Sequence, residues 1–226
     1  MNRKEFLRLA GGVHLSNHNY DDWNGRNRYE YFWGFFEGNN RNAPSIYKGI
    51  AVRDLFDAEE FSIEHILPMD FVYNHMKSQN RKIRNGASTN PFNMAACHRD
   101  VNRARGSSPF DLDGDSIALH YDFGPDAEGR DEAGHDDEYE WVVPRRTRGD
   151  VARAVLYMCL CYEIGGFEPG DYLTLTKWAL EDQPSKWEIA FCRWVHKKHG
   201  ICNPYIEHHQ REMLEAPELM RELVKS

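Results

Sequence analysis

The sequence predicts a single domain of the α+β class over residues 1–226. Three observations lead to this prediction. Short stretches rich in β-branched and aromatic residues lie before residue 100, at 50–56, 61–67 and 92–97. Longer apolar stretches flanked by helix-capping residues follow residue 150. No internal repeat or low-complexity linker divides the chain, and 226 residues suit one domain.

Helix and strand signals place the individual elements. Pro68 ends the second predicted strand, 61–67, and a basic loop with a helix at 72–79 follows it. A short helix at 100–105 ends at Gly106. Asp150 is the expected N-cap of a helix at 151–164 that is apolar on nearly every face and therefore buried. Three further helices are expected at 172–181, at 185–200 with a Ser185–Glu188 capping box, and from Pro217.

The composition limits the class of protein. With 41% hydrophobic and 13% aromatic residues, the chain is expected to be globular, and no apolar run is long enough to span a membrane. The N-terminus has basic residues but no apolar signal segment, so we expect an intracellular protein, or a secreted or periplasmic one if a leader was removed. The five Cys residues include no CxxC pair, which favours reduced thiols.

Charge is distributed unevenly along the chain. The net charge of −8 argues against a nucleic-acid partner, but residues 71–109 contain seven Lys or Arg and one acid. Six of these bases are candidate nucleic-acid contacts, with a solvated basic face as the alternative: Lys77, Arg81, Lys82, Arg84, Arg99 and Arg103. Residues 110–140 contain twelve acids and one base, and we expect a surface excursion at about 111–140. Its run 111–122 only partly resembles a calcium loop.

The chemistry is predicted at Glu64-His65, at the end of an apolar stretch. Cutting a phosphodiester requires a base, a cation on the phosphate and positive charge for the developing anion. His65 suits the first role, and Glu64 offers an oxygen ligand for a hard cation. Asn102, on the short predicted helix, supplies a second oxygen. Adjacent strand residues point to opposite faces, so Glu64 and His65 can share a site only where the strand bends or ends.

Three segments of the chain, in the family's order, resemble the bacterial endonuclease I family of non-specific nucleases. The first is Glu64-His65-x-x-Pro68, and the second runs from Asn93 through Asn102 to Gly106. The third is Arg148-Gly149-Asp150-Val151-Ala152-Arg153-Ala154, and a weaker fourth contains Trp178, Trp187-Glu188 and Asn203-Pro204. Together they span roughly residues 60 to 206. Ala96 departs from the family's Pro, and the first sixty residues show no match.

The resemblance implies a ββα-metal (His-Me finger) core at about 60–106, with a helical C-terminal part at 150–226. His65 would be the general base, and Glu64 and Asn102 would bind one Mg²⁺, with Mn²⁺ and Ca²⁺ as alternatives. Arg153 would contact a phosphate or product, and Arg105 is also expected to hold a phosphate. The implied substrate is double- or single-stranded DNA, with RNA left open, cut to give a 5′-phosphate and a 3′-hydroxyl.

Each of these residues also has a structural interpretation. His65 could be a buried His bonded to Glu64, Asn102 could stabilise a turn, and Arg153 could form a structural salt bridge. The rival function is a catalytically inactive nucleic-acid-binding or packaging module on the same fold. The intact Glu64, His65 and Asn102 set argues against this rival, because a binding module has no need of all three.

Overall fold

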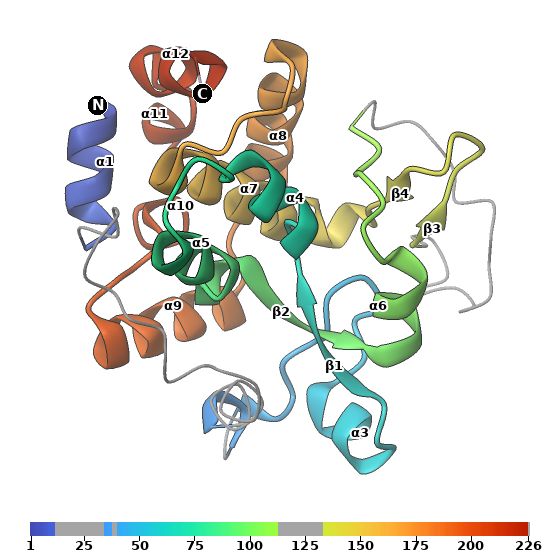
Figure 1. Cartoon of the computed structure of the whole chain (residues 1–226). Coiled ribbons are helices and arrows are strands. Elements are labelled where there is room, and N and C mark those ends of the chain that lie inside the picture. Colours follow the sequence, from blue (N-terminus) through green and yellow to red (C-terminus); the bar gives the residue numbers. More distant parts are fainter. Residues whose placement is uncertain (12–33, 38–39, 113–132, 226) are drawn as a thin grey trace.

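The computed structural model describes residues 1–11, 34–37, 40–112 and 133–225. Two antiparallel strands lie at its centre, β1 (Phe61–His65) and β2 (Met94–His98) (Figure 1). Their register pairs Phe61 with His98 and His65 with Met94. On the far side of β2, the Ile46 backbone N–H donates to the Ala96 carbonyl at 2.8 Å, so the segment around Ile46 flanks this strand.

Helix α6 (Arg99–Arg105) follows β2 without an intervening loop. His98 is the last residue of β2 and also the N-cap of α6, where its Nδ1 accepts from the Asp100 backbone N–H at 3.2 Å. The helix ends at Gly106, whose φ of 55° lies in the left-handed region that favours glycine. The sequence prediction for this helix is confirmed within one residue. Because helix and strand are continuous, α6 packs back against β1 and β2.

A stretch of mostly short helices connects the two strands. It contains α4 (Met69–His75), α5 (Arg81–Ser88) and the 3₁₀ turn η3 (Pro91–Asn93). The predicted helix at 72–79 begins earlier than expected, directly after Pro68, and α5 was not predicted. The predicted strand at 50–56 is wrong, because this segment forms helix α3 (Val52–Asp57). Val52 and Leu55 are three residues apart and both buried, a helical spacing that the β-branched content obscured.

The buried helix α7 (Arg148–Tyr162) organises the C-terminal part. Around it pack α1 (Arg3–Leu9), α8 (Pro169–Glu181), α10 (Pro204–Glu207) and α12 (Pro217–Lys225) (Figure 1). All but two of its fifteen residues are buried, as its continuous apolar sequence predicts. The predicted N-cap is wrong: Thr147 precedes the helix after the turn η4 (Arg145–Thr147), and Asp150 lies inside the first turn.

The remaining elements agree with the capping signals where those were present. Helix α9 (Lys186–His199) begins after Ser185, whose side chain forms the predicted capping box with Glu188. The helix ends at its C-cap residue, Gly200. α12 begins at Pro217 as predicted, while the short α11 (Arg211–Leu214) was not anticipated. Of the acidic excursion, residues 113–132 lie outside the described residues. The remainder contains β3 (Gly134–His135), which pairs with β4 (Trp141–Val142).

Two properties of the described residues bear on the predicted class of protein. All five cysteines are buried free thiols. No helix in the described part of the chain has the length and apolar character needed to cross a membrane.

Gly149, in the first turn of α7, is expected to tolerate no side chain. A Cβ at this position would overlap the Asp182 carbonyl oxygen and the Arg153 guanidinium, whereas a Cβ at Gly170 in α8 would meet nothing within 4 Å. We therefore expect Gly149→Ala to lower the free energy of unfolding by at least about 2 kcal/mol. The control Gly170→Ala should raise it by up to about 1 kcal/mol. Urea unfolding measures both, and equal stabilities would contradict this packing.

Candidate active site

Glu64 is a buried carboxylate with two strong hydrogen-bond donors. Its side chain is 2% exposed, and its Oε1 accepts from Arg105 Nη1 at 2.6 Å and from the Tyr47 hydroxyl at 3.0 Å. Burial raises the pKa of Glu64, while the charge of Arg105 and the hydrogen bonds from Tyr47 and Arg105 oppose this rise. The Tyr47 and Arg105 side chains both donate to Oε1, and the His65 backbone also hydrogen-bonds the carboxylate, so its orientation is fixed.

Arg105 reaches from the last turn of α6 to the end of β1. Besides Glu64, its guanidinium donates to the carbonyls of His65 and Ile66, both at 2.9 Å. Its other side lies 4.4 Å from the centre of the Phe110 ring. With 1% exposure, it cannot reach a phosphate in this conformation. The predicted phosphate contact finds no support in this conformation, in which Arg105 positions the end of the strand that carries Glu64 and His65.

Asn102 lies against the same strand. Its Nδ2 donates to the Ser62 hydroxyl and to the Ile63 carbonyl, both at 2.8 Å. Ser62 and Glu64 are two residues apart in β1, so their side chains point to the same face of the strand, which α6 covers. No described residue donates a hydrogen bond to Asn102 Oδ1. Residues almost forty positions apart thus bring a carboxylate and an amide oxygen to one face of β1.

His65 is the last residue of β1 and is half-buried. Glu64 and His65 are adjacent within β1, where they pair with Ala95 and Met94, so their side chains leave opposite faces of the strand and can share a site only at its tip. The turn that follows is fixed by Asn93, which is fully buried. Asn93 Oδ1 accepts from the Leu67 backbone N–H at 2.7 Å, and its Nδ2 donates to the Leu67 carbonyl at 3.0 Å. The Asn93 side chain therefore provides the Leu67 backbone with the two hydrogen bonds that a neighbouring strand would otherwise provide.

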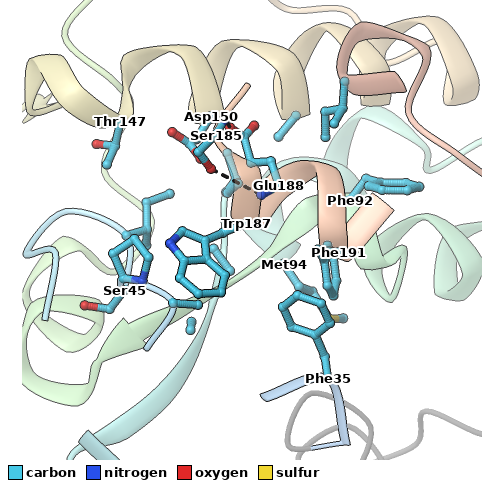
Figure 2. A pocket seen from close by; sticks show the side chains of 18 of the residues that line it. Phe35, Ser45, Phe92, Met94, Thr147, Asp150, Ser185, Trp187, Glu188 and Phe191 are labelled. Carbon is cyan, nitrogen blue, oxygen red and sulfur yellow. Dashed lines mark hydrogen bonds between the residues drawn. The ribbon is translucent and has the colours of Figure 1, made fainter. Parts of the chain in front are cut away.

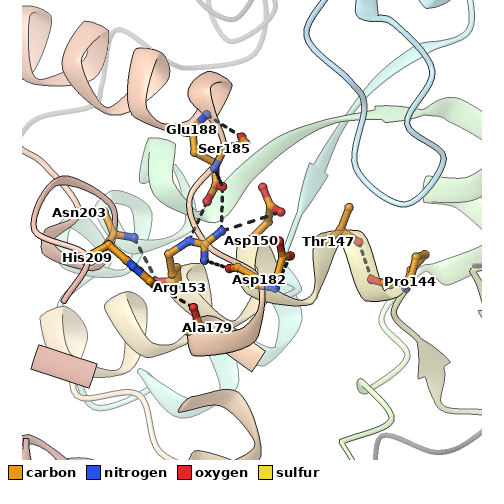
Figure 3. A network of polar contacts seen from close by, with 11 residues as sticks. Pro144, Thr147, Asp150, Arg153, Ala179, Asp182, Ser185, Glu188, Asn203 and His209 are labelled. Atoms are coloured by element: carbon orange, nitrogen blue, oxygen red, sulfur yellow. Dashed lines mark hydrogen bonds and ion pairs between the residues drawn. The ribbon is translucent and has the colours of Figure 1, made fainter. Parts of the chain in front are cut away.

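Arg153 is held in a network of acids instead of facing solvent (Figure 3). It is 0% exposed, and its Nε and Nη2 bind the two carboxylate oxygens of Glu188 at 2.8 and 2.7 Å. Its Nη1 donates to the Asp182 carbonyl, and Asp150 lies 4.0 Å away. The predicted phosphate contact of Arg153 finds no support in this arrangement either. Arg153 ties α7 to α9 and to the end of α8, the structural interpretation left open by the sequence.

The candidate nucleic-acid contacts fall into two groups. Lys77 and Arg81 are exposed near the start of α5, where Arg84 lies 5.9 Å from the Tyr73 ring centre. Lys82 is in the same helix. On α6, Arg99 and Arg103 are exposed, with side chains 51% and 76% accessible. In Figure 1, α5 and α6 lie on opposite sides of the β1–β2 pair, so bases flank the strands that carry the candidate site.

A second group of possible cation ligands lies near α6. Carboxylate oxygens of Asp111, Asp136 and Glu140 lie within 4.8 Å of one another, and Asp111 and Asp136 are buried. Asp136 Oδ1 also accepts from the backbone N–H groups of Glu138 and Glu140 at 3.0 and 2.7 Å. Oxygen ligands of this kind suit hard cations. Asp111 begins the run that partly resembled a calcium loop, but Asp136 and Glu140 do not belong to that run.

Two positioning residues of the site were missed in the sequence. Tyr47 lies in a stretch without a recognised motif, and nothing there indicates its bond to Glu64. Asn93 carried a usable signal, since a polar side chain at the start of an apolar strand needs partners.

A comparison with protein families matches the chain to one of them. The model of the family described as Endonuclease I matches residues 52–210, which include β1, β2, α6 and the helices from α7 to α10. A search of curated proteins gave no match.

Removing Arg105 should destabilise the protein, because the buried Glu64 carboxylate would lose its charged partner. Arg105→Met leaves the Glu64 carboxylate without its cation, and we expect the free energy of unfolding to fall by about 3–5 kcal/mol. The double variant with Glu64→Gln should recover part of this loss, because no buried charge remains. The exposed Arg103→Met is the control and should change stability by less than about 0.5 kcal/mol. Urea unfolding of the parent, the two single variants and the double variant measures these differences. An Arg105→Met protein as stable as the parent would contradict the structural role of Arg105.

Asp150 gives the fold a dependence on pH. Burial, and next the charge of Glu188, raise the pKa of Asp150 well above its ordinary value. The folded chain thus binds this proton more tightly than the unfolded chain, so stability falls as pH rises from the ordinary carboxyl range through the raised pKa. Asp150→Asn is neutral throughout, so its stability relative to the parent should rise with pH over that window. Urea unfolding at several pH values, with exposed Asp57→Asn as control, tests this; a constant difference contradicts it.

Proposed function

Because the chain belongs to the endonuclease I family, we propose that it is a metal-dependent endonuclease that cuts DNA within the strand with little sequence preference. One observation carries the proposal. The Asn102 side chain bonds Ser62 and Ile63 of β1, on the face of the strand that carries Glu64, and His65 follows Glu64 at the end of the strand. A structural role alone would not require this combination of a carboxylate, an amide oxygen and an imidazole.

The residues fit a hard divalent cation by the chemistry of their donors. Tyr47 and Arg105 both bind Glu64 Oε1, and we assign Oε2, the oxygen that neither side chain bonds, to the ion. Asn102 uses its Nδ2 on the strand, so Oδ1 is its ligand atom. Mg²⁺ suits such oxygen ligands, with Mn²⁺ and Ca²⁺ as alternatives. When bound, the ion would polarise the scissile phosphate and offset its developing charge.

The chain's own groups supply the remaining functions. His65 takes a proton from the attacking water at an imidazole nitrogen, and the water attacks phosphorus in line with the leaving 3′ oxygen. Arg105 keeps Glu64 oriented and bonds the His65 carbonyl, so ligand and base are fixed by one side chain. The exposed bases of α5 and α6 attract the phosphate backbone. The products would be a 5′-phosphate and a 3′-hydroxyl.

Plasmid nicking tests the metal and the base separately. We expect nicking with Mg²⁺ and none with EDTA, and cutting that persists in EDTA would exclude the metal. His65→Ala should lower the rate by about two to four powers of ten, the usual contribution of a general base. The exposed His208→Ala is the matched control and should cut at the parent rate.

The inactive-module alternative and the choice of nucleic acid are decided in the same assay. A chain that binds DNA but leaves it intact at every concentration of Mg²⁺ and Mn²⁺ is a binding module. Single-stranded DNA and RNA of the same sequence are run in parallel, because both carry the phosphodiester that this site would cleave.

A further inference from the structure

A cavity of about 350 Å³ lies apart from Glu64, His65 and Asn102 (Figure 2). It is bounded by β2, by the segment 43–49 that flanks this strand, and by the facing sides of α7 and α9. None of the three proposed active-site residues lines it, although Ile66, which follows His65, does. Cavities of this size hold small molecules in other proteins.

Aromatic side chains form the walls of this cavity. Trp187 of α9 projects into its middle, and Phe35, Phe92 and Phe191 line one side (Figure 2). The rings of Phe35 and Phe191 meet edge to face with centroids 5.0 Å apart. Trp187 is only half-buried, so part of its surface remains available to a ligand. A flat ring would stack well on such surfaces.

Two carboxyl groups lie at one end of the cavity. Asp150 of α7 and Glu188 of α9 both line it, beside Ser185 (Figure 2). Both oxygens of Glu188 are bound by Arg153, whereas Asp150 has Arg153 only at 4.0 Å and keeps 29% of its side chain accessible. Burial and the neighbouring Glu188, which Asp150 also hydrogen-bonds, raise the pKa of Asp150, and its accessible side chain can accept a hydrogen bond from a ligand in the cavity.

Basic groups line the same cavity from the other elements. Lys48 comes from the segment 43–49, and Arg146 comes from η4, where its guanidinium also donates to the Tyr47 carbonyl. A purely apolar ligand would lie against charged groups at this end of the cavity with which it could form no hydrogen bond. An organic cation would suit the aromatic walls and acids, but Lys48 and Arg146 oppose it. The lining therefore suits a ligand with a flat ring, a hydrogen-bonding edge and a negative charge.

We propose that this cavity binds a single nucleotide whose base carries an amino group beside a ring nitrogen, as adenine and cytosine do. The amino group donates to the Asp150 carboxyl group. The ring stacks on Trp187, and the phosphate lies toward Lys48 and Arg146. This site is additional to the proposed nuclease site and does not depend on hydrolysis at His65.

The test measures binding by titration calorimetry with the His65→Ala chain in EDTA, where no cleavage is expected. Adenosine 5′-monophosphate is compared with purine riboside 5′-monophosphate, which differs only in lacking the amino group. We expect at least about tenfold tighter binding of the adenosine nucleotide, because the other ligand leaves a carboxyl oxygen unpaired. Equal affinity, or no binding of either nucleotide, overturns the proposal.

Variants locate the site. Asp150→Ala should lose at least about tenfold in affinity, whereas Asp150→Asn should keep it, because the amide oxygen still accepts from the adenine amino group. Ala154→Leu fills the cavity from α7 and should abolish binding even if Asp150→Ala does not fold. Ala190→Leu adds the same atoms to α9 outside the cavity and is the control. Unchanged binding by Ala154→Leu overturns the location.

The source of the nucleotide is decided with a tetranucleotide containing one adenine among thymines, compared with the all-thymine strand. If Ala154→Leu weakens the adenine-containing strand, the cavity accepts a base of a nucleic-acid strand. If it weakens only the free nucleotide, the ligand is a mononucleotide. Either result supports the site. If Ala154→Leu weakens the binding of neither ligand, the proposed site is contradicted.

Discussion

The buried ion pair between Arg105 and Glu64 holds the central part of this protein together. Its 2.6 Å contact joins the last turn of α6 to the end of β1, and the same guanidinium bonds two carbonyls of that strand end. A buried ion pair stabilises a fold only weakly compared with apolar packing, but losing one partner is costly. The pair therefore acts chiefly as a geometric constraint, because it allows few arrangements of α6 on β1.

Arg153 plays a comparable part among the helices. It neutralises Glu188 and bonds the end of α8, so three helices meet at one guanidinium. Both buried arginines were predicted to hold phosphates, Arg153 because a cation inside an apolar helix is unusual. The acids that neutralise them, Glu64 and Glu188, are 41 and 35 residues away in sequence, so only the tertiary structure identifies the pairs.

The elements carrying the candidate site could be predicted from the sequence. Strong local signals, the β-branched content of 61–67 and the glycine after 105, located β1 and α6, and recurring family segments placed Glu64 with Asn102. The features that the sequence did not predict depend on tertiary contacts. Val52 and Leu55 form a helix because both are buried at helical spacing, and Tyr47 joins the site through one hydroxyl that no local pattern reveals. The exposure of Arg105 could not be predicted, since it depends on how α6 lies on β1.

The direct passage from β2 into α6 sets how this region can change in length. His98 ends the strand and caps the helix, so one residue inserted after it would turn Asn102 about 100° around the helix axis, away from β1. By contrast, the 28 residues between β1 and β2 form their own helices and return to a register fixed by pairing and by Asn93. Relatives can therefore vary in length between the strands without disturbing the site, whereas the strand-to-helix junction must keep its length.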